Sequence, residues 1–256
     1  MKTGIIINNV GTPKNPSPQA VGEYLKEFLM DKEIIPLPWI LRYILVHFII
    51  VPKRKYDSSK KYQSIWGKNK SPLLEYSESF LEKLQVQLGQ QYIVKLGMCF
   101  GSPSIEQAVI DIVKAQVDKI LFVPMYPQKA RATTVAATNL FRKYIKKHNF
   151  SGVIESFSPF YKEEAFVENS VRMLQADLAL CKYDHVLFSF HGLPDTPIAQ
   201  EYKEQCIATA DFISRRAGLK KDFYSVSFQS RLGPKKWLTP YTSEVAIALA
   251  AEGCKR

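Results

Sequence analysis

Cysteine is scarce in this chain, and its spacing excludes several kinds of site. Only four of the 256 residues are cysteines: Cys99, Cys181, Cys206 and Cys254. No two of them form a C-x-x-C pair or a zinc-finger pattern, and they lack the spacing of iron–sulfur ligands. We therefore expect reduced thiols in a cytosolic protein, with Cys254 the most exposed, and we expect no iron–sulfur cluster.

Common motifs of nucleotide and hydrolase chemistry are missing too. No G-x-G-x-x-G follows the first apolar run, and the chain contains no G-x-x-x-x-G-K-[ST], H-E-x-x-H or G-x-S-x-G. These absences argue against nucleotide-dependent chemistry and against hydrolysis by a serine triad. The opening apolar run, residues 4–10, is too short for a signal peptide and predicts a first strand instead.

The balance of residue types indicates a folded, basic protein. Hydrophobic residues make up 46% of the chain and charged residues 23%, which suits one large domain or two small ones and is not typical of disorder. The formal net charge of +11 favours an anionic partner. Lysine and arginine are spread along the chain rather than gathered in one stripe. We therefore expect a membrane surface or an acidic small molecule rather than nucleic acid.

A long apolar stretch, residues 34–51, does not read as a membrane span. It contains Pro36, Pro38, Arg42 and His47. A spanning helix needs about twenty largely apolar residues, and a central arginine in it is costly. The basic run PKRKYDSSKKY follows directly. Three interpretations remain open: an amphipathic segment lying in a membrane interface, a buried helix with a solvated charged end, and a mobile lid over a flat apolar ligand.

Short runs rich in Ile, Val and Phe alternate with amphipathic runs along the chain. Strands are predicted at 4–10, 92–98, 119–125, 152–157, 185–190 and 222–228. Helices are predicted at about 18–30, 72–88, 104–116, 133–147, 161–180, 199–217 and 242–252. This alternation predicts an α/β protein with two Rossmann-like, doubly wound parallel-sheet lobes. A polar stretch at 146–152 sets the expected boundary between an N-terminal lobe, residues 1–150, and a C-terminal lobe, residues 151–256.

The ends of these strands are where a ligand should bind, because open α/β sheets bind ligands beyond the carboxyl ends of their strands. We expect the ends to converge on one cleft between the lobes. The run LFSFHGLP places His191 at such an end, with Gly192 leaving space for a bulky ligand and Pro194 stiffening the loop. Neutral imidazole binds Fe²⁺ or Zn²⁺ and accepts protons near pH 7. The alternative is a structural histidine bonded to a backbone carbonyl.

The remaining candidates are less specific. Trp237 is framed by prolines after the sixth strand, which is equally consistent with a loop anchor and with a flat wall for an aromatic ligand. His185 begins the same strand as His191 at its opposite end, so it should not share the cleft. His47 is expected in the lid and His148 at a solvated helix end.

Several blocks of the sequence resemble the ferrochelatase family, whose members insert ferrous iron into a porphyrin to make haem. The resemblance covers essentially the whole chain, and the blocks appear in the family's order. The blocks are NNVGTP (8–13), YLKEFLMD (24–31), YQSIW with SPL (62–66 and 71–73), LGMCFGSPSI (96–105), VPMYPQ (123–128), LFSFHGLP (187–194) and SFQSRLGPKKWLTPYT (227–242). The histidine and tryptophan blocks together are highly specific.

The resemblance implies a function for particular residues. It implies that porphyrin lies in the cleft between the lobes and that His191 is the catalytic histidine, acting as proton acceptor or metal ligand. Three further residues are implied to line or border the porphyrin pocket: Tyr62, Ser71 and Trp237. The 34–51 stretch is implied to be an apolar lip where porphyrin enters and where the protein touches membrane. The lip residues are Leu29, Met30, Ile34 and Trp39.

The chain departs from the family pattern at three places. The family's second catalytic group is a glutamate in a later C-L-E-T motif, which this sequence does not contain, so we expect a fragment of a longer gene. Members read M-R-Y-G where this chain has residues 98–101, so Cys99 replaces a basic residue. The usual P-Q-Y-S is represented by residues 127–130, where Lys129 replaces a tyrosine and offers a partner for a propionate.

The resemblance implies a cytoplasmic monomer, peripheral at the inner face of the membrane, that needs no cofactor and takes Fe²⁺ as a substrate. It leaves protoporphyrin IX and coproporphyrin III both open. One alternative is a truncated or inactive chelatase-like protein that binds porphyrin or haem without turnover, which the missing glutamate supports. Another is a chelatase for a different tetrapyrrole. The lip and the two-lobe order of blocks disfavour the short, single-lobe chelatases.

Overall fold

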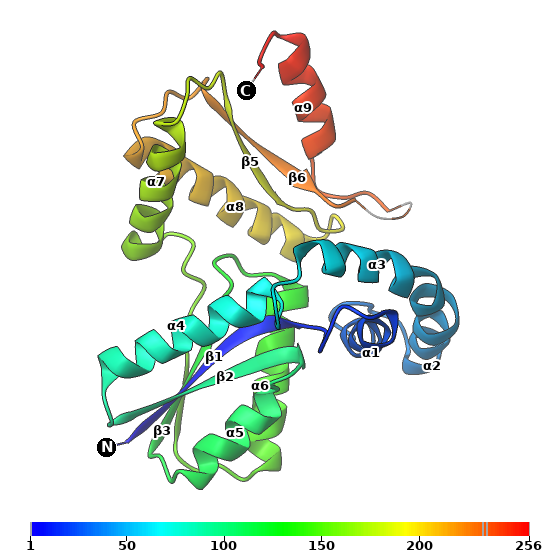
Figure 1. The fold of residues 1–256 in the computed structure, drawn as a ribbon, viewed down its shortest axis with the longest axis vertical. Helices are drawn as coiled ribbons and strands as arrows, with labels where there is room; N and C mark the ends of the chain where they lie inside the picture. The colour runs from blue at the N-terminus through cyan, green and yellow to red at the C-terminus, as the bar shows by residue number, and fades with distance from the viewer. Residues whose placement is uncertain (1, 232, 234, 256) are drawn as a thin grey trace. The chain divides into compact units, whose positions relative to one another are not determined.

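The computed structural model describes residues 2–231, 233 and 235–255, which form two compact units (Figure 1). The first unit contains the chain up to Tyr126 together with Arg131–Ser158. The second contains Pro127–Ala130 and the chain from Pro159 onward. The division therefore comes after Ser158 rather than after residue 150, because the strand β4 (Val153–Ser156) belongs to the sheet of the first unit.

The first unit is built on four parallel strands in the order β2-β1-β3-β4. Strand β1 spans Thr3–Thr12, β2 spans Tyr92–Gly101 and β3 spans Lys119–Pro124. Successive side chains point to opposite faces of a strand, so Ile6 faces one layer of helices while Ile5 and Ile7 face the other. Both layers are apolar, as expected for a parallel sheet covered on both faces.

Helices cover both faces of this sheet (Figure 1). Helix α4 (Pro72–Leu88) packs on the side of Ile5 and Ile7 through its leucines. The Ile6 side is covered by α1 (Pro18–Leu29), α5 (Ile105–Lys114) and α6 (Ala136–Lys147). In that layer the rings of Phe122 and Phe141 stack with their centroids 4.3 Å apart. The short π-helical segment η2 (Arg131–Val135) precedes α6.

Three helical segments follow one another between α1 and α4. They are α2 (Trp39–Ile44), the π-helical η1 (Leu45–Ile50) and α3 (Val51–Ile65). Their inward side packs on α1 through Leu29, Val46 and Val51. Arg42, the charged residue that argued against a membrane span, is buried here, and one terminal nitrogen of its guanidinium donates to the carbonyls of Ile35 and Leu37 at 3.2 and 2.9 Å. Its Nε is buried without a hydrogen-bond partner among the described residues.

The second unit is smaller. Strands β5 (Val186–His191) and β6 (Tyr224–Gln229) form a parallel pair, and helices α7 (Glu164–Leu178), α8 (Pro197–Arg216) and α9 (Thr242–Ala251) accompany it. Phe228, Leu238, Cys206 and Tyr202 form its main core. The predicted strands and helices are all present, and the parallel α/β fold class is confirmed.

Residues 127–130 leave the first unit and join the second. Gln128 Nε2 donates to Thr209 Oγ1 at 2.9 Å, and the backbone N–H of Lys129 donates to Gln205 Oε1 at 2.7 Å. Ala130 is buried in the Phe228 core. The second unit therefore includes four residues, 127–130, that interrupt the sequence of the first unit.

Candidate active site

His191 is the last residue of β5, and its neighbours are fixed by backbone bonds. It pairs in register with Gln229 at the end of β6. The next residue, Gly192, donates its N–H to the Gln229 carbonyl at 2.7 Å. A Cβ on residue 192 would lie 2.7 Å from that same oxygen and 3.4 Å from Cε3 of Trp237. Glycine is therefore needed here for the close approach of the two strand ends, and it is residue 192, directly after His191, that lies against the indole.

The His191 ring is exposed and chemically available. Its nitrogens make no hydrogen bond to any residue that the structure describes, so the alternative of a histidine bonded to a carbonyl is not observed in this part of the chain. Partial loss of water around the ring lowers the pKa of His191 below its usual 6.5. Near neutral pH the imidazole is thus uncharged, with a lone pair free to accept a proton or to bind a metal ion.

The other three histidines are held by neighbours. His185 Nε2 lies 2.9 Å from Ser225 Oγ, at the start of β5 as expected. His148, at the end of α6, lies 3.2 Å from a Glu106 carboxylate oxygen. His47 Nδ1 lies 3.1 Å from the Tyr43 carbonyl, and its ring stacks on that tyrosine. These contacts set His191 apart from the other three.

Trp237 lies in the segment that returns past His191. Pro194 and Trp237 form an antiparallel bridge, and the N–H of Leu238 donates to the Leu193 carbonyl at 2.9 Å. The indole N–H is buried and has no hydrogen-bond partner among the described residues. Trp237 therefore anchors the loop after β5, and its segment pairs with the residues that directly follow His191.

The strand ends of the first unit meet around a buried polar cluster that the sequence patterns did not single out. Asn8 of β1 donates from Nδ2 to Cys99 Sγ of β2 at 3.3 Å and to the Gly97 carbonyl at 2.7 Å. Tyr126, just after β3, brings its hydroxyl to 3.6 Å from the same sulfur. Burial raises the pKa of the Cys99 thiol, so it is neutral near pH 7. Cys99, which the resemblance sets where a basic side chain is expected, thus forms part of a neutral hydrogen-bond network.

Tyr62 borders this cluster, whereas Ser71 is committed to structure. The Tyr62 ring meets the Tyr24 ring edge-on with centroids 6.4 Å apart, and burial raises the pKa of both hydroxyls. Tyr24 itself donates to the Gly11 carbonyl at 3.1 Å. Ser71 is buried, and its hydroxyl accepts from the Leu74 N–H at 3.3 Å as the N-cap of α4. In this structure its side chain stabilises a helix end.

The expected lip residues divide into a packed group and an exposed one. Leu29 is buried between α1 and η1, and Met30 and Ile34 pack partly against it. Trp39 is 60% exposed and stacks on Tyr43 with ring centroids 5.3 Å apart. Leu29 therefore supports the lip from inside, and Trp39 belongs to its exposed apolar surface.

Lys129, which replaces a tyrosine of the family pattern, is already paired. Its ammonium lies 3.3 Å from Glu201 Oε2 on α8. Both side chains are partly exposed, so the pair is solvated. The suggested partnership with a propionate would have to compete with this carboxylate.

Across the described ranges, 2–231, 233 and 235–255, no group of three or more His, Cys, Asp or Glu residues is arranged to hold a metal ion. No described helix is both long and apolar enough to cross a membrane.

Two parallel α/β units, with a free histidine ending a strand of the second, define a protein of the chelatase-like fold class. The fold resembles SirB from Bacillus subtilis, a structure with Fe³⁺, at a TM-score of 0.57 and 14% identity over 97% of this chain and 71% of that one. The family model for ferrochelatase matches residues 2–256. The chain belongs to the ferrochelatase family.

Curated relatives agree over nearly the full chain. The ferrochelatase of Bdellovibrio bacteriovorus is 36% identical over 99% of this chain and 82% of its own length. The ferrochelatase of Coxiella burnetii is 35% identical over 100% of this chain and 77% of its own. The ferrochelatase of Legionella pneumophila is 34% identical, with shares of 100% and 82%.

Proposed function

We propose that this protein inserts ferrous iron into a porphyrin ring to form haem. The family match and the ferrochelatase relatives support the reaction. The single structural observation that carries it is His191, an exposed imidazole at a strand end, with a lowered pKa and no hydrogen-bond partner among the residues that the structure describes. Neutral imidazole at a strand end is suited to proton transfer and to contact with a borderline metal.

The reaction requires a base and a site that controls the shape of the porphyrin ring. A porphyrin loses two pyrrole N–H protons as it gains one Fe²⁺, and in a flat ring those protons and lone pairs lie in the ring plane. A site that binds a bent ring exposes them, and binding energy offsets the strain. His191 would accept one of the two protons or hold the arriving Fe²⁺ on one face. The lowered pKa favours both roles, because each requires the unprotonated ring.

The experiment is metal insertion by the 256-residue chain. The protein is mixed with Fe²⁺ or Zn²⁺ and with protoporphyrin IX or coproporphyrin III in the absence of oxygen, and porphyrin absorbance is followed. We expect insertion by the unaltered chain, its loss in His191→Ala, and porphyrin binding within about threefold in both. The matched control is His185→Gln, at the other end of the same strand, which should keep activity.

The outcomes separate the alternatives. Clear porphyrin binding without any metal insertion would overturn the proposed enzyme activity. It would favour the alternative, a protein that binds porphyrin without turnover. Equal losses of binding and of rate in His191→Ala would remove the catalytic assignment. The ring that is metallated faster decides between protoporphyrin and coproporphyrin.

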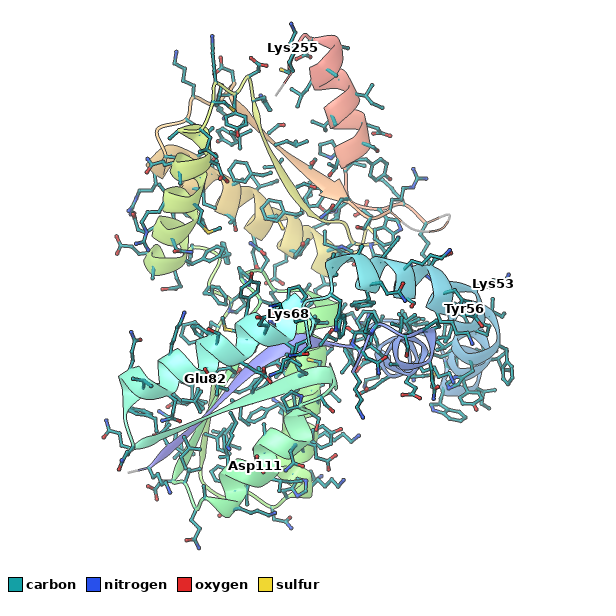
Figure 2. All side chains as sticks on the ribbon, in the orientation of Figure 1. Lys53, Tyr56, Lys68, Glu82, Asp111 and Lys255 are labelled. Atoms are coloured by element: carbon teal, nitrogen blue, oxygen red, sulfur yellow. The ribbon has the colours of Figure 1, made fainter. Side chains whose placement is uncertain are left out.

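We also propose peripheral contact with an anionic membrane surface through α2 and η1. Ile40 is 66% exposed and Phe48 is 69% exposed, and with Trp39 they form an apolar surface. The helix that follows, α3, carries Lys53 and Arg54 in its first turn, and Figure 2 shows Lys53 and Tyr56 projecting from it. Apolar side chains flanked by basic ones match the boundary between acyl chains and anionic headgroups.

A further inference from the structure

The backbone carbonyl of His191 receives a hydrogen bond from a buried side chain. Tyr202 lies on the inward side of α8, and its hydroxyl donates to the His191 carbonyl at 3.0 Å. Tyr202 is buried in the core with Phe228 and Leu238. The bond therefore connects the end of β5 to the packed interior of the second unit.

The tyrosine hydroxyl is held as a neutral donor. Cys206, one helical turn later on α8, is fully buried in the same core as Tyr202 and is close enough to affect the titration of its hydroxyl. Burial raises the pKa of Cys206 to about 12, and burial likewise raises the pKa of Tyr202. Both groups stay protonated across the physiological range, so the bond to the carbonyl persists with pH.

The peptide that joins His191 to Gly192 is bonded at both of its polar atoms. Its carbonyl accepts from Tyr202, and its N–H donates to Gln229 at 2.7 Å. The imidazole makes no bond of its own to the described residues, so its direction depends on the backbone that bears it. With that peptide plane fixed, the ring is left with only its two side-chain torsions.

We infer that Tyr202 is a positioning residue for metal insertion, acting through the His191 carbonyl rather than by touching porphyrin or iron. The inference rests on the proposed function for its catalytic consequence. Its structural part is that the Tyr202 hydroxyl sets the geometry of His191, and this part can be tested without measuring activity. Loss of the hydroxyl should leave the ring of residue 202 packed while the strand end relaxes.

The first test reads the histidine directly. The full chain is labelled with ¹⁵N at histidine, and the His191 ring signals are identified by their absence in His191→Ala. Tyr202→Phe should shift or broaden the His191 signals and leave those of His148 unchanged. The matched control is Tyr224→Phe, which removes a different hydroxyl of the same unit, one bonded to Asp211 at 2.6 Å. Unchanged His191 signals in folded Tyr202→Phe would overturn the inference.

The second test uses steady-state kinetics. Tyr202→Phe should lower kcat about tenfold to a hundredfold while the KM for porphyrin stays within about twofold, because small displacements of a reacting group cost rate rather than binding. Tyr224→Phe should change neither. A rise in KM alone, or equal kcat in both variants, would refute the positioning role.

A third variant covers the case in which Tyr202→Phe fails to fold. Cys206→Ala keeps the tyrosine and removes the thiol beside its hydroxyl. Cys206→Ala should shift the His191 signals in the same direction as Tyr202→Phe but by a smaller amount. Unshifted His191 signals in Cys206→Ala would count against the inference. If the unaltered chain inserts no metal, the proposed function fails, and the ring signals still decide whether Tyr202 positions His191.

Discussion

The N–H of Gly192 and the carbonyl of Gln229 meet at 2.7 Å, and a Cβ on the glycine would lie at that same distance from the oxygen. Real Cβ atoms do not approach an oxygen so closely. The two strand ends can therefore hold this contact only with glycine at position 192.

Gly192→Ala should destabilise the protein by about 1–3 kcal/mol and lower metal insertion, because the strand ends must separate to admit the methyl group. Denaturant unfolding and the insertion assay measure the two effects. Gly22→Ala, on α1, is the control, since its Cβ would meet the nearest side-chain atom at 3.6 Å. Equal stability in the two variants would contradict the prediction.

The pH dependence follows from His191. Because desolvation lowers its pKa, the unfolded chain binds this proton more tightly than the folded one. Stability should therefore rise with pH across the window between the lowered pKa and about 6.5, and fall as the pH drops through the folded pKa. Insertion needs the neutral ring, so kcat/KM should rise with pH through an inflection that lies below 6.5. An inflection above that value, or a stability profile unaltered in His191→Ala, would argue against this reading.

The four thiols should differ in reactivity. Cys99 and Cys206 are buried, and burial raises the pKa of both, whereas Cys181 and Cys254 are only partly covered. Brief alkylation of the native protein at pH 8 should label Cys181 and Cys254 first, since the thiolate is the reacting form. Peptide mass spectrometry gives the order. Early labelling of Cys99 would show that the cluster around Asn8 opens readily.

Membrane contact should depend on the exposed ring of Phe48. Phe48→Ser should weaken binding to vesicles that contain anionic lipid by about tenfold, because a large apolar side chain contributes about 1.5–3 kcal/mol when it leaves water. Val86→Ser is the control, since Val86 is exposed on α4 at a distance in sequence from the lip. Flotation of the protein with vesicles at low and at high salt separates the apolar contribution to membrane binding from the electrostatic one. Equal binding of the two variants would remove the proposed surface.

Lys129→Gln should hardly affect porphyrin affinity. Its ammonium is held by Glu201, and solvated ion pairs contribute only about 0–1 kcal/mol, so stability should also change little. Porphyrin titration by fluorescence measures the affinity. A loss greater than about fivefold would show that the lysine exchanges its carboxylate for a substrate propionate.

Periodicity and strand-end logic were sufficient to predict the six strands, the helices that alternate with them and the position of His191 at a strand end, because these depend on local pattern. The helices α2 and α3 with η1 between them were not predicted, because this stretch is broken by prolines and followed by a basic run. The partner of β4 could not be predicted, since pairing with β3 is a contact between distant segments. The only sequence signal for the helix cap formed by Ser71 was a serine directly before a proline. Tyr202 had no signal beyond its place on an amphipathic helix, because a hydroxyl bonded to a backbone carbonyl leaves no motif.

The four residues 127–130 make the second unit discontinuous in sequence. A fragment that starts at Pro159 would lack the side-chain partner of Thr209, the backbone partner of Gln205 and the buried methyl of Ala130. During synthesis those residues emerge well before β5 and α8, so the second unit is completed by a segment already present. A single protease cut after Ser158 would accordingly leave each fragment of the chain holding part of the second unit.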